Sequence, residues 1–227
     1  MKPDYNWHYL ETAGQVAQSA CRHILEVANT AITKRGQFKI VLAGGTTPEK
    51  VYRLLAESQA DWSKWLIYYG DERCLPKNHP ERNSVMATKA FLDKVAISQP
   101  QVFTIPAELG PEQAASLYRQ TLKDALPFDL VLLGMGEDGH TASLFPGHGH
   151  NEEELAHAVY NSPKPPPERV SMSAKALGTT HQVIFLITGT NKQEAVKQWR
   201  SGHNLPIATI QSNKMDVYID REAYQNG

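Results

Sequence analysis

The stretch Asp129–Gly147, DLVLLGMGEDGHTASLFPG, joins a short apolar run to a polar continuation rich in glycine. Residues 129–133 are typical of a β-strand buried on both faces, because their apolar side chains do not alternate with polar ones. The strand is predicted to end at Gly134, and charged side chains follow soon after it. In open α/β sheets, ligands bind beyond the carboxyl ends of the strands. This stretch therefore indicates both a fold class and the place of a site.

Similar apolar runs occur on either side of this stretch and alternate with helical patterns. We predict further strands at Lys39–Ala43, Trp65–Tyr69, Val170–Met172, Val183–Thr188 and Val217–Ile219. We predict helices at Leu10–Thr33, Asn83–Leu92, Pro111–Leu126 and Asn191–Trp199, with one more directly after Gly44-Gly45. Strands with apolar runs on both faces, separated by helices, favour an α/β fold whose largely parallel sheet has helices on both faces.

The overall charge is close to balanced. The 227 residues include 23 Lys and Arg against 24 Asp and Glu, a formal net charge of −1. This balance provides no bulk positive field, so we expect no nucleic-acid partner and no membrane partner. The apolar runs are too short to span a bilayer, and the N-terminal MKPDYNWHYL lacks the pattern of a secretory signal. Cys21 and Cys74 have no metal or redox spacing, so reduced thiols and a cytoplasmic location are expected.

Polar residues follow four of the predicted strands at the ends where ligands bind in such sheets. These segments are Gly44–Thr47, Gly70–Arg73, Gly134–His140 and Gly189–Lys192. One glycine after one strand is ordinary, whereas four polar strand ends favour a composite site.

Gly44 and Gly45 precede a predicted helix, and the two glycines let backbone amides approach a ligand closely. The helix N-terminus adds partial positive charge, which favours a phosphate. Thr46 and Thr47 are candidates for the N-cap, and Pro48 suits the first helical position. The same residues also fit a plain strand-to-helix turn, and the pattern leaves both interpretations open.

Residues 134–139 match the spacing GxGxxG of dinucleotide-binding proteins, but Pro146 and Gly147 interrupt the helix that such a site requires. We therefore expect these glycines to bend the backbone so that Asp138 and His140 face a cavity. His140 is the candidate acid/base residue, because imidazole exchanges a proton near neutral pH. Asp138 could orient the ring or hold a substrate hydroxyl. The alternative for His140 is a cap on a following short helix.

Metal and serine chemistry are disfavoured. His140, His148, His150 and His157 cluster in the sequence but lack the HExxH spacing, so we expect no metal. Ser143 lies outside any GxSxG motif, so a serine nucleophile is poorly supported.

Charged residues also lie near other predicted strands. Asp71, Glu72 and Arg73 carry both signs of charge, and a solvated, salt-bridged turn is the commoner structure for such a run. Arg169 and Lys192 could supply the local positive charge that the net balance lacks, and arginine suits bidentate phosphate contact. Residues 147–169 are predicted to form an exposed, partly stiff connection.

Several motifs together resemble the glucosamine-6-phosphate isomerase/6-phosphogluconolactonase family. They are LAGGTTP at 42–48, GDERCLP at 70–76 with His79 and Asn83 after it, the stretch at 129–147, PKPPPERVSMS at 163–173 and TGTNK at 188–192. Ser143–Pro146 has the lactonase form of the family's third motif. Arg82 stands where the family usually has serine, which leaves the role of Asn83 open.

The resemblance implies a single three-layer α/β/α domain over residues 1–227 that hydrolyses 6-phospho-D-glucono-1,5-lactone without a cofactor. It implies a small sugar-phosphate lactone as the substrate, and we expect a monomer or a small homo-oligomer. An amino-sugar-phosphate deaminase, with Asp71 moving a proton between carbons, and a non-catalytic sugar-phosphate sensor are the alternatives.

A mechanism for the lactonase follows as a hypothesis. The amides of Gly44, Gly45, Thr46 and Thr47, with Arg169 and Lys192, are expected to hold the phosphate. His140 is expected to activate water, and Arg73 or an amide near Gly45 to stabilise the oxyanion. Asp138 and Asp71 are expected to position His140 or the sugar hydroxyls.

Overall fold

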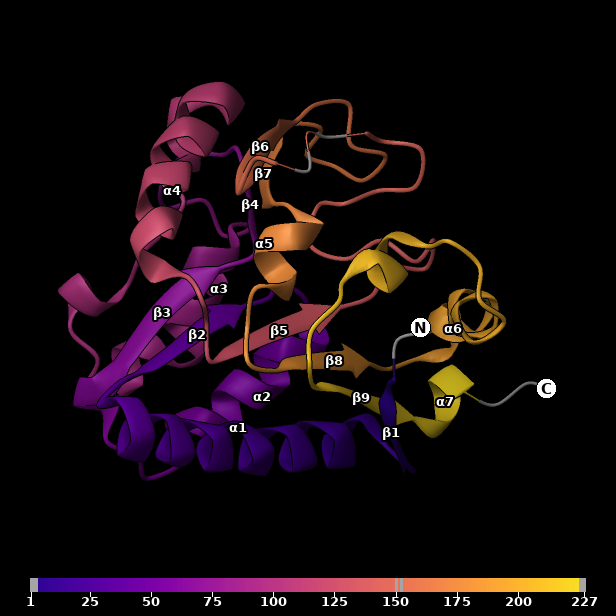
Figure 1. Ribbon diagram of the computed structural model, residues 1–227, viewed down its shortest axis with the longest axis horizontal. Coiled ribbons are helices and arrows are strands. Elements are labelled where there is room, and N and C mark those ends of the chain that lie inside the picture. Colours follow the sequence, from indigo (N-terminus) through magenta and orange to yellow (C-terminus); the bar gives the residue numbers. More distant parts are fainter. Residues whose placement is uncertain (1–3, 150, 152, 225–227) are drawn as a thin grey trace.

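The computed structural model describes residues 4–149, 151 and 153–224, and a six-stranded parallel sheet forms its centre (Figure 1). The strands in spatial order are β1 (Asn6–Leu10), β9 (Met215–Asp220), β8 (Val183–Ile187), β5 (Leu130–Gly134), β2 (Phe38–Leu42) and β3 (Trp65–Tyr69). Each neighbouring pair runs parallel. The predicted α/β fold with a largely parallel sheet is therefore confirmed.

Helices lie on both sides of this sheet. They are α1 (Ala13–Arg35), α2 (Thr46–Ala56), α3 (Asn83–Ala90), α4 (Pro111–Ala125), α5 (Ala174–Gly178), α6 (Gln193–Arg200) and α7 (Arg221–Tyr224). Helices α1 and α2 pack together below the sheet in Figure 1, and α4 and α5 lie above it. In α4, Pro111 stands at the first helical position, and Ala114, Ala115, Tyr118 and Leu122 are buried at helical spacing.

A second, smaller sheet lies over the central one. It contains β4 (Asp71–Arg73), β7 (Arg169–Met172) and β6 (Ala156–Val159), and both pairings are antiparallel. The prediction that residues 147–169 form only an exposed connection is therefore wrong for 156–159, which form β6. The predicted strand at 170–172 is confirmed as β7, in this second sheet.

The N-terminal prediction needs a correction. Residues 6–10 form the edge strand β1, whereas a helix was predicted to begin at Leu10. Thr12 and Gln15 form a capping box that starts α1 at Ala13. The side chains of β1 are exposed or half-buried, so this strand shows no continuous apolar run.

The start of α2 also differs from the prediction. Gly45 is the N-cap and α2 begins at Thr46, so neither Thr46 nor Thr47 caps it and Pro48 is the third helical residue. The Thr47 hydroxyl lies 2.6 Å from Oγ1 of Thr188 instead. This contact joins the start of α2 to the end of β8.

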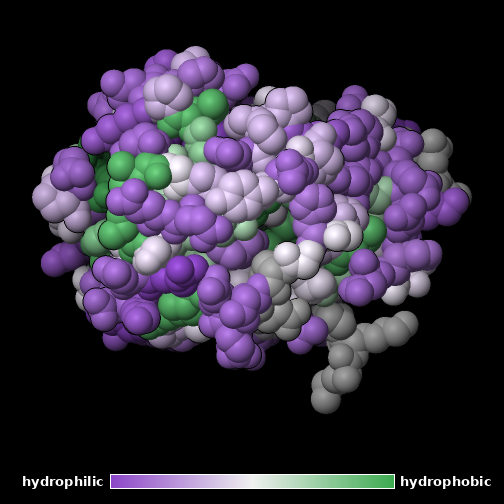
Figure 2. All heavy atoms as spheres, turned by 90° about the horizontal axis from the view of Figure 1, so that it is seen from above, coloured by the Kyte–Doolittle hydropathy of each residue, from purple (hydrophilic) through white to green (hydrophobic). Residues whose placement is uncertain are grey.

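The surface is mainly polar. Figure 2 shows one face, seen from above, on which hydrophilic residues predominate and apolar residues form small separate patches. The large apolar side chains that are exposed include Tyr9, Leu109, Leu117 and Tyr160. Within the described ranges, no helix combines the length and the apolar character needed to cross a bilayer.

A buried polar cluster lies where β8 and β9 begin. The Gln182 amide donates to Oδ2 of Asp216 at 2.6 Å and lies 2.9 Å from Nε2 of His23. Nδ1 of His23 lies 2.7 Å from the Tyr218 hydroxyl. Because an amide nitrogen only donates, Nε2 of His23 accepts and the ring is neutral in this arrangement.

We expect this cluster to lose stability in mild acid. Burial lowers the pKa of His23, although the charge of Asp216 acts in the opposite direction. The native state therefore binds a proton less readily than the unfolded chain, whose histidines titrate near about 6.5, and stability is lost as the pH falls below that value. The fall in Tm from pH 7 to pH 5 should be smaller in His23→Gln than in the unmodified protein. The exposed His203, changed to Gln, is the control; an unchanged pH dependence in His23→Gln would contradict the prediction.

Candidate active site

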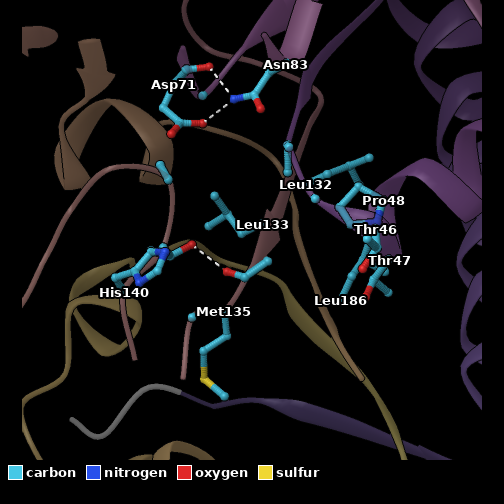
Figure 3. Close-up of a pocket in the computed structure, with 18 of the residues that line it drawn as sticks. Thr46, Thr47, Pro48, Asp71, Asn83, Leu132, Leu133, Met135, His140 and Leu186 are labelled. Carbon is cyan, nitrogen blue, oxygen red and sulfur yellow. Dashed lines mark hydrogen bonds between the residues drawn. The ribbon is translucent and has the colours of Figure 1, made fainter. Parts of the chain in front are cut away.

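A cavity of about 310 Å³ lies at the carboxyl ends of β2, β3, β5 and β8 (Figure 3). Its lining includes Gly44–Thr47, Gly70, Asp71, Arg73, Asn83, Gly134–Gly136, His140, Arg169, Asn191 and Lys192. The structure thus brings the four predicted strand ends together at one cavity, and adds Arg169 from β7.

His140 and Asp138 form a close pair at this cavity. Nδ1 of His140 lies 2.5 Å from Oδ1 of Asp138, which also accepts the backbone N–H of His140 at 3.1 Å. The His140 ring packs at 4.6 Å from the ring of Phe145, and its side chain is 19% exposed. Asp138 does not line the cavity itself; it contacts His140, which does. The segment after His140 forms turns and no helix, so the interpretation of His140 as a helix cap is wrong.

The Asp138 carboxylate favours one tautomer of His140. Burial alone would raise the pKa of Asp138, but the attraction and hydrogen bonds of His140 outweigh it and lower this pKa. An ionised carboxylate only accepts hydrogen bonds, so Nδ1 of His140 carries the proton. Nε2 of the neutral ring is then free of a proton and can accept one from water.

Gly136 is required for this pair to form. A Cβ atom at this position would lie 2.0 Å from Nδ1 of His140 and 2.7 Å from Oδ1 of Asp138. Real Cβ atoms do not approach other atoms so closely, so the glycine makes room for the His140 ring.

The glycine pair after β2 forms a second wall. Gly44–Thr47 line the cavity, and Figure 3 shows Thr46 and Thr47 across the cavity from His140. A Cβ on Gly44 would lie 2.0 Å from Oδ1 of Asn83, so the glycine allows the Asn83 side chain to pack against the β2 end.

The two predicted cations both line the cavity but differ in their contacts. Burial lowers the pKa of Lys192, and the nearby Glu137 charge partly opposes this effect. Arg169 is 4% exposed and donates from Nε to the Pro166 carbonyl and from Nη2 to the carbonyls of Lys164 and Pro165. Arg169 therefore also holds the loop before β7.

The solvated-turn interpretation of residues 71–73 is wrong, because Asp71 is 6% and Glu72 0% exposed. The Glu72 carboxylate accepts the backbone N–H groups of Asn83 at 2.7 Å and Ser84 at 2.9 Å, at the start of α3. Arg73 lines the cavity and donates to the Glu81 carbonyl.

The sequence did not indicate the roles of Ser143 or Arg82. Ser143 donates to Oδ2 of Asp71 at 2.5 Å. Arg82 is 2% exposed and pairs with Glu108 at 2.7 Å, and its Nε lies 3.4 Å from the Glu72 carboxylate. The sequence gave no local signal for these contacts, because Arg82 and its partners Glu72 and Glu108 are distant in sequence and meet only in the folded chain.

Metal binding has no support in the described part of the chain, where no three His, Cys, Asp or Glu side chains are grouped suitably. His148 and His157 line a different cavity from His140. His150 lies outside the described residues. The absence of a metal stays a prediction.

The fold and the cavity are those of an α/β protein with an imidazole–carboxylate pair at the strand ends. The chain belongs to the glucosamine-6-phosphate isomerase/6-phosphogluconolactonase family, whose sequence pattern matches residues 11–219.

Relatives with a lactonase name cover most of the chain. A probable 6-phosphogluconolactonase 4, chloroplastic, of Oryza sativa subsp. indica is 35% identical over 235 residues, which is 92% of this chain and 72% of the relative. The 6-phosphogluconolactonase of Streptomyces coelicolor is 38% identical over 207 residues, 82% of this chain and 79% of the relative.

Solved structures agree in fold. The 6-phosphogluconolactonase of Thermotoga maritima has a TM-score of 0.90 and 27% identity, covering 96% of this chain and 100% of its own. A monomeric glucosamine-6-phosphate deaminase has a TM-score of 0.83 at 21% identity, covering 96% and 98%, and shares the fold alone. The fold therefore does not by itself separate the two activities.

Proposed function

We propose that this chain hydrolyses 6-phospho-D-glucono-1,5-lactone to 6-phospho-D-gluconate, a step of the oxidative pentose phosphate pathway. The observation that carries the proposal is the His140–Asp138 pair, 2.5 Å apart, at a cavity that Gly44–Thr47 and Lys192 also line. The lactonase names of the relatives at 35% and 38% identity support the choice of substrate.

His140 supplies the acid/base chemistry. Nε2 takes a proton from a water molecule, whose oxygen attacks the lactone carbonyl carbon. The carbonyl oxygen becomes an oxyanion, which needs a hydrogen-bond donor at the cavity wall. Arg73 is the proposed donor, and an amide near Gly45 is the alternative. The protonated imidazole of His140 then gives its proton to the ring oxygen of the lactone, as the bond between the carbonyl carbon and that oxygen breaks.

The phosphate orients the substrate from the other side of the cavity. The amides of Gly44–Thr47 and the charges of Lys192 and Arg169 provide positive potential in a chain whose net charge is −1. Binding energy from this remote group holds the lactone carbonyl near His140. We propose that the enzyme acts in the cytoplasm without a cofactor, as a monomer or a small homo-oligomer.

Lys192 gives the cleaner test of phosphate binding, because Arg169 also holds the loop at 164–166. We expect Lys192→Ala to raise KM for the lactone at least about tenfold with a smaller change in kcat, since the phosphate is bound in both ground and transition states. Lys197→Ala, an exposed lysine on α6, is the matched control. An unchanged KM in steady-state kinetics of Lys192→Ala would remove this residue from the phosphate site.

The proposal is tested by a continuous lactonase assay on freshly generated lactone, with an enzyme-free control because the lactone also hydrolyses spontaneously. A parallel assay measures ammonia release from glucosamine 6-phosphate. Rapid lactone hydrolysis without ammonia release supports the proposal. Ammonia release would favour the deaminase, and binding of 6-phosphogluconate without any rate enhancement would favour a sensor.

A further inference from the structure

Two donors from distant parts of the chain hold the Asp71 carboxylate. Oδ1 accepts the side-chain amide of Asn83 at 2.9 Å, and Oδ2 accepts the Ser143 hydroxyl at 2.5 Å. Asp71, Asn83 and Ser143 are 6%, 4% and 2% exposed. Figure 3 shows Asp71 and Asn83 together at one end of the cavity, away from His140. The carboxylate is therefore held where little water can replace either donor.

The backbone around Ser143 fixes the direction of its hydroxyl. Ala142 has φ +48°, a left-handed conformation that is uncommon for a residue with a Cβ atom. Before it, the Thr141 hydroxyl donates to the Gly134 carbonyl at 2.8 Å; after it, the Ser143 N–H donates to the Ser171 hydroxyl at 3.2 Å. The turn is anchored on both sides of Ala142, so the Ser143 side chain is directed at Asp71.

The Asp71 carboxylate is fixed by two hydrogen bonds and can still accept others. An ionised carboxylate has about four acceptor positions, and Asn83 and Ser143 use one on each oxygen. Asp71 lines the cavity, so a hydroxyl of the sugar ring can occupy a remaining position.

We propose that Ser143 is a positioning residue that acts through Asp71, which accepts a hydroxyl of the sugar ring. The inference rests on the proposed lactonase function. It assigns a role in binding to a serine that does not touch the substrate.

A double-mutant cycle tests the proposal, with kcat and KM for the lactone measured in Ser143→Ala, Asp71→Asn and the double variant. We expect Ser143→Ala to lower kcat/KM about tenfold, mainly through KM, because it removes a hydrogen bond to a charged group. In the Asp71→Asn background the same change should cost less than about twofold, because its effect passes through Asp71. Ser143→Cys keeps the branching of the side chain with a slightly larger and weaker donor, and its kcat/KM should fall between those of serine and alanine.

Ser173→Ala is the matched control, since Ser173 is fully buried and its hydroxyl accepts from the Ala176 N–H at the start of α5. It should lower Tm without changing KM. An equal loss from Ser143→Ala in both backgrounds, or a KM unchanged by Ser143→Ala, would overturn the proposal. The Kd of 6-phosphogluconate is measured for the same variants. If the protein had no lactonase activity, the proposed function would be refuted, and these Kd values would still test the role of Ser143.

Discussion

His140→Asn should lower kcat for lactone hydrolysis by about 10²–10⁴. The ring is the acid/base group of the proposed mechanism, and Asp138 holds it with Nδ1 at 2.5 Å from Oδ1. Asparagine can keep a hydrogen bond to Asp138 but cannot take a proton from water near neutral pH. The expected change therefore falls on kcat, measured under saturating lactone and corrected for spontaneous hydrolysis.

The phosphate site should survive this change, because Lys192 and the Gly44–Thr47 amides do not depend on the imidazole. The Kd of 6-phosphogluconate for His140→Asn should therefore stay within a few fold of that of the unmodified protein. His148→Asn, which alters a histidine at a different cavity, is the matched control. Near-normal turnover in His140→Asn would remove His140 from the mechanism.

Gly136→Ala should lower kcat about a hundredfold or more while the protein stays folded. The added methyl group would lie 2.0 Å from Nδ1 of His140 and 2.7 Å from Oδ1 of Asp138. Both side chains are short and hydrogen-bonded to each other, so the clash can be relieved only if the His140 imidazole moves from its position at the cavity. A displacement of about 1 Å at a reacting group can cost about 10²-fold in rate.

Gly14→Ala provides the control for this second substitution. Gly14 lies in the first turn of α1, and a Cβ atom there would meet only Oγ1 of Thr12, at an ordinary 3.7 Å. This variant should keep its kcat and its Tm. If Gly136→Ala were as active as Gly14→Ala, the claim that the His140–Asp138 pair requires a glycine at position 136 would be refuted.

The central sheet and the place of the cavity were predictable from the sequence. Strands β2, β3, β5 and β8 are largely buried on both faces, so their sequences are apolar runs in which Lys39 is the one charged residue. Because these strands are parallel, their carboxyl ends meet, and the polar residues after them gather at one edge. The roles of the site residues stay predictions that the variants above test.

Other features had no local signal. No residue of the edge strand β1 is fully buried, β4 consists of three charged residues, and His157 interrupts the short strand β6. The Ser143–Asp71 hydrogen bond joins residues 72 positions apart in the chain. Such a contact arises from the tertiary fold, so neither composition nor periodicity could indicate it.

The three residues of β4 have a consequence for how such a chain tolerates insertions and deletions. Asp71 and Arg73 line the cavity, whereas Glu72 points away from it to the first amides of α3. Side chains of a strand alternate between its two faces, so a shift of one position would exchange these destinations. Length variation among descendants of this gene is therefore expected to avoid the segment between β3 and α3 and to accumulate in exposed segments such as residues 146–149.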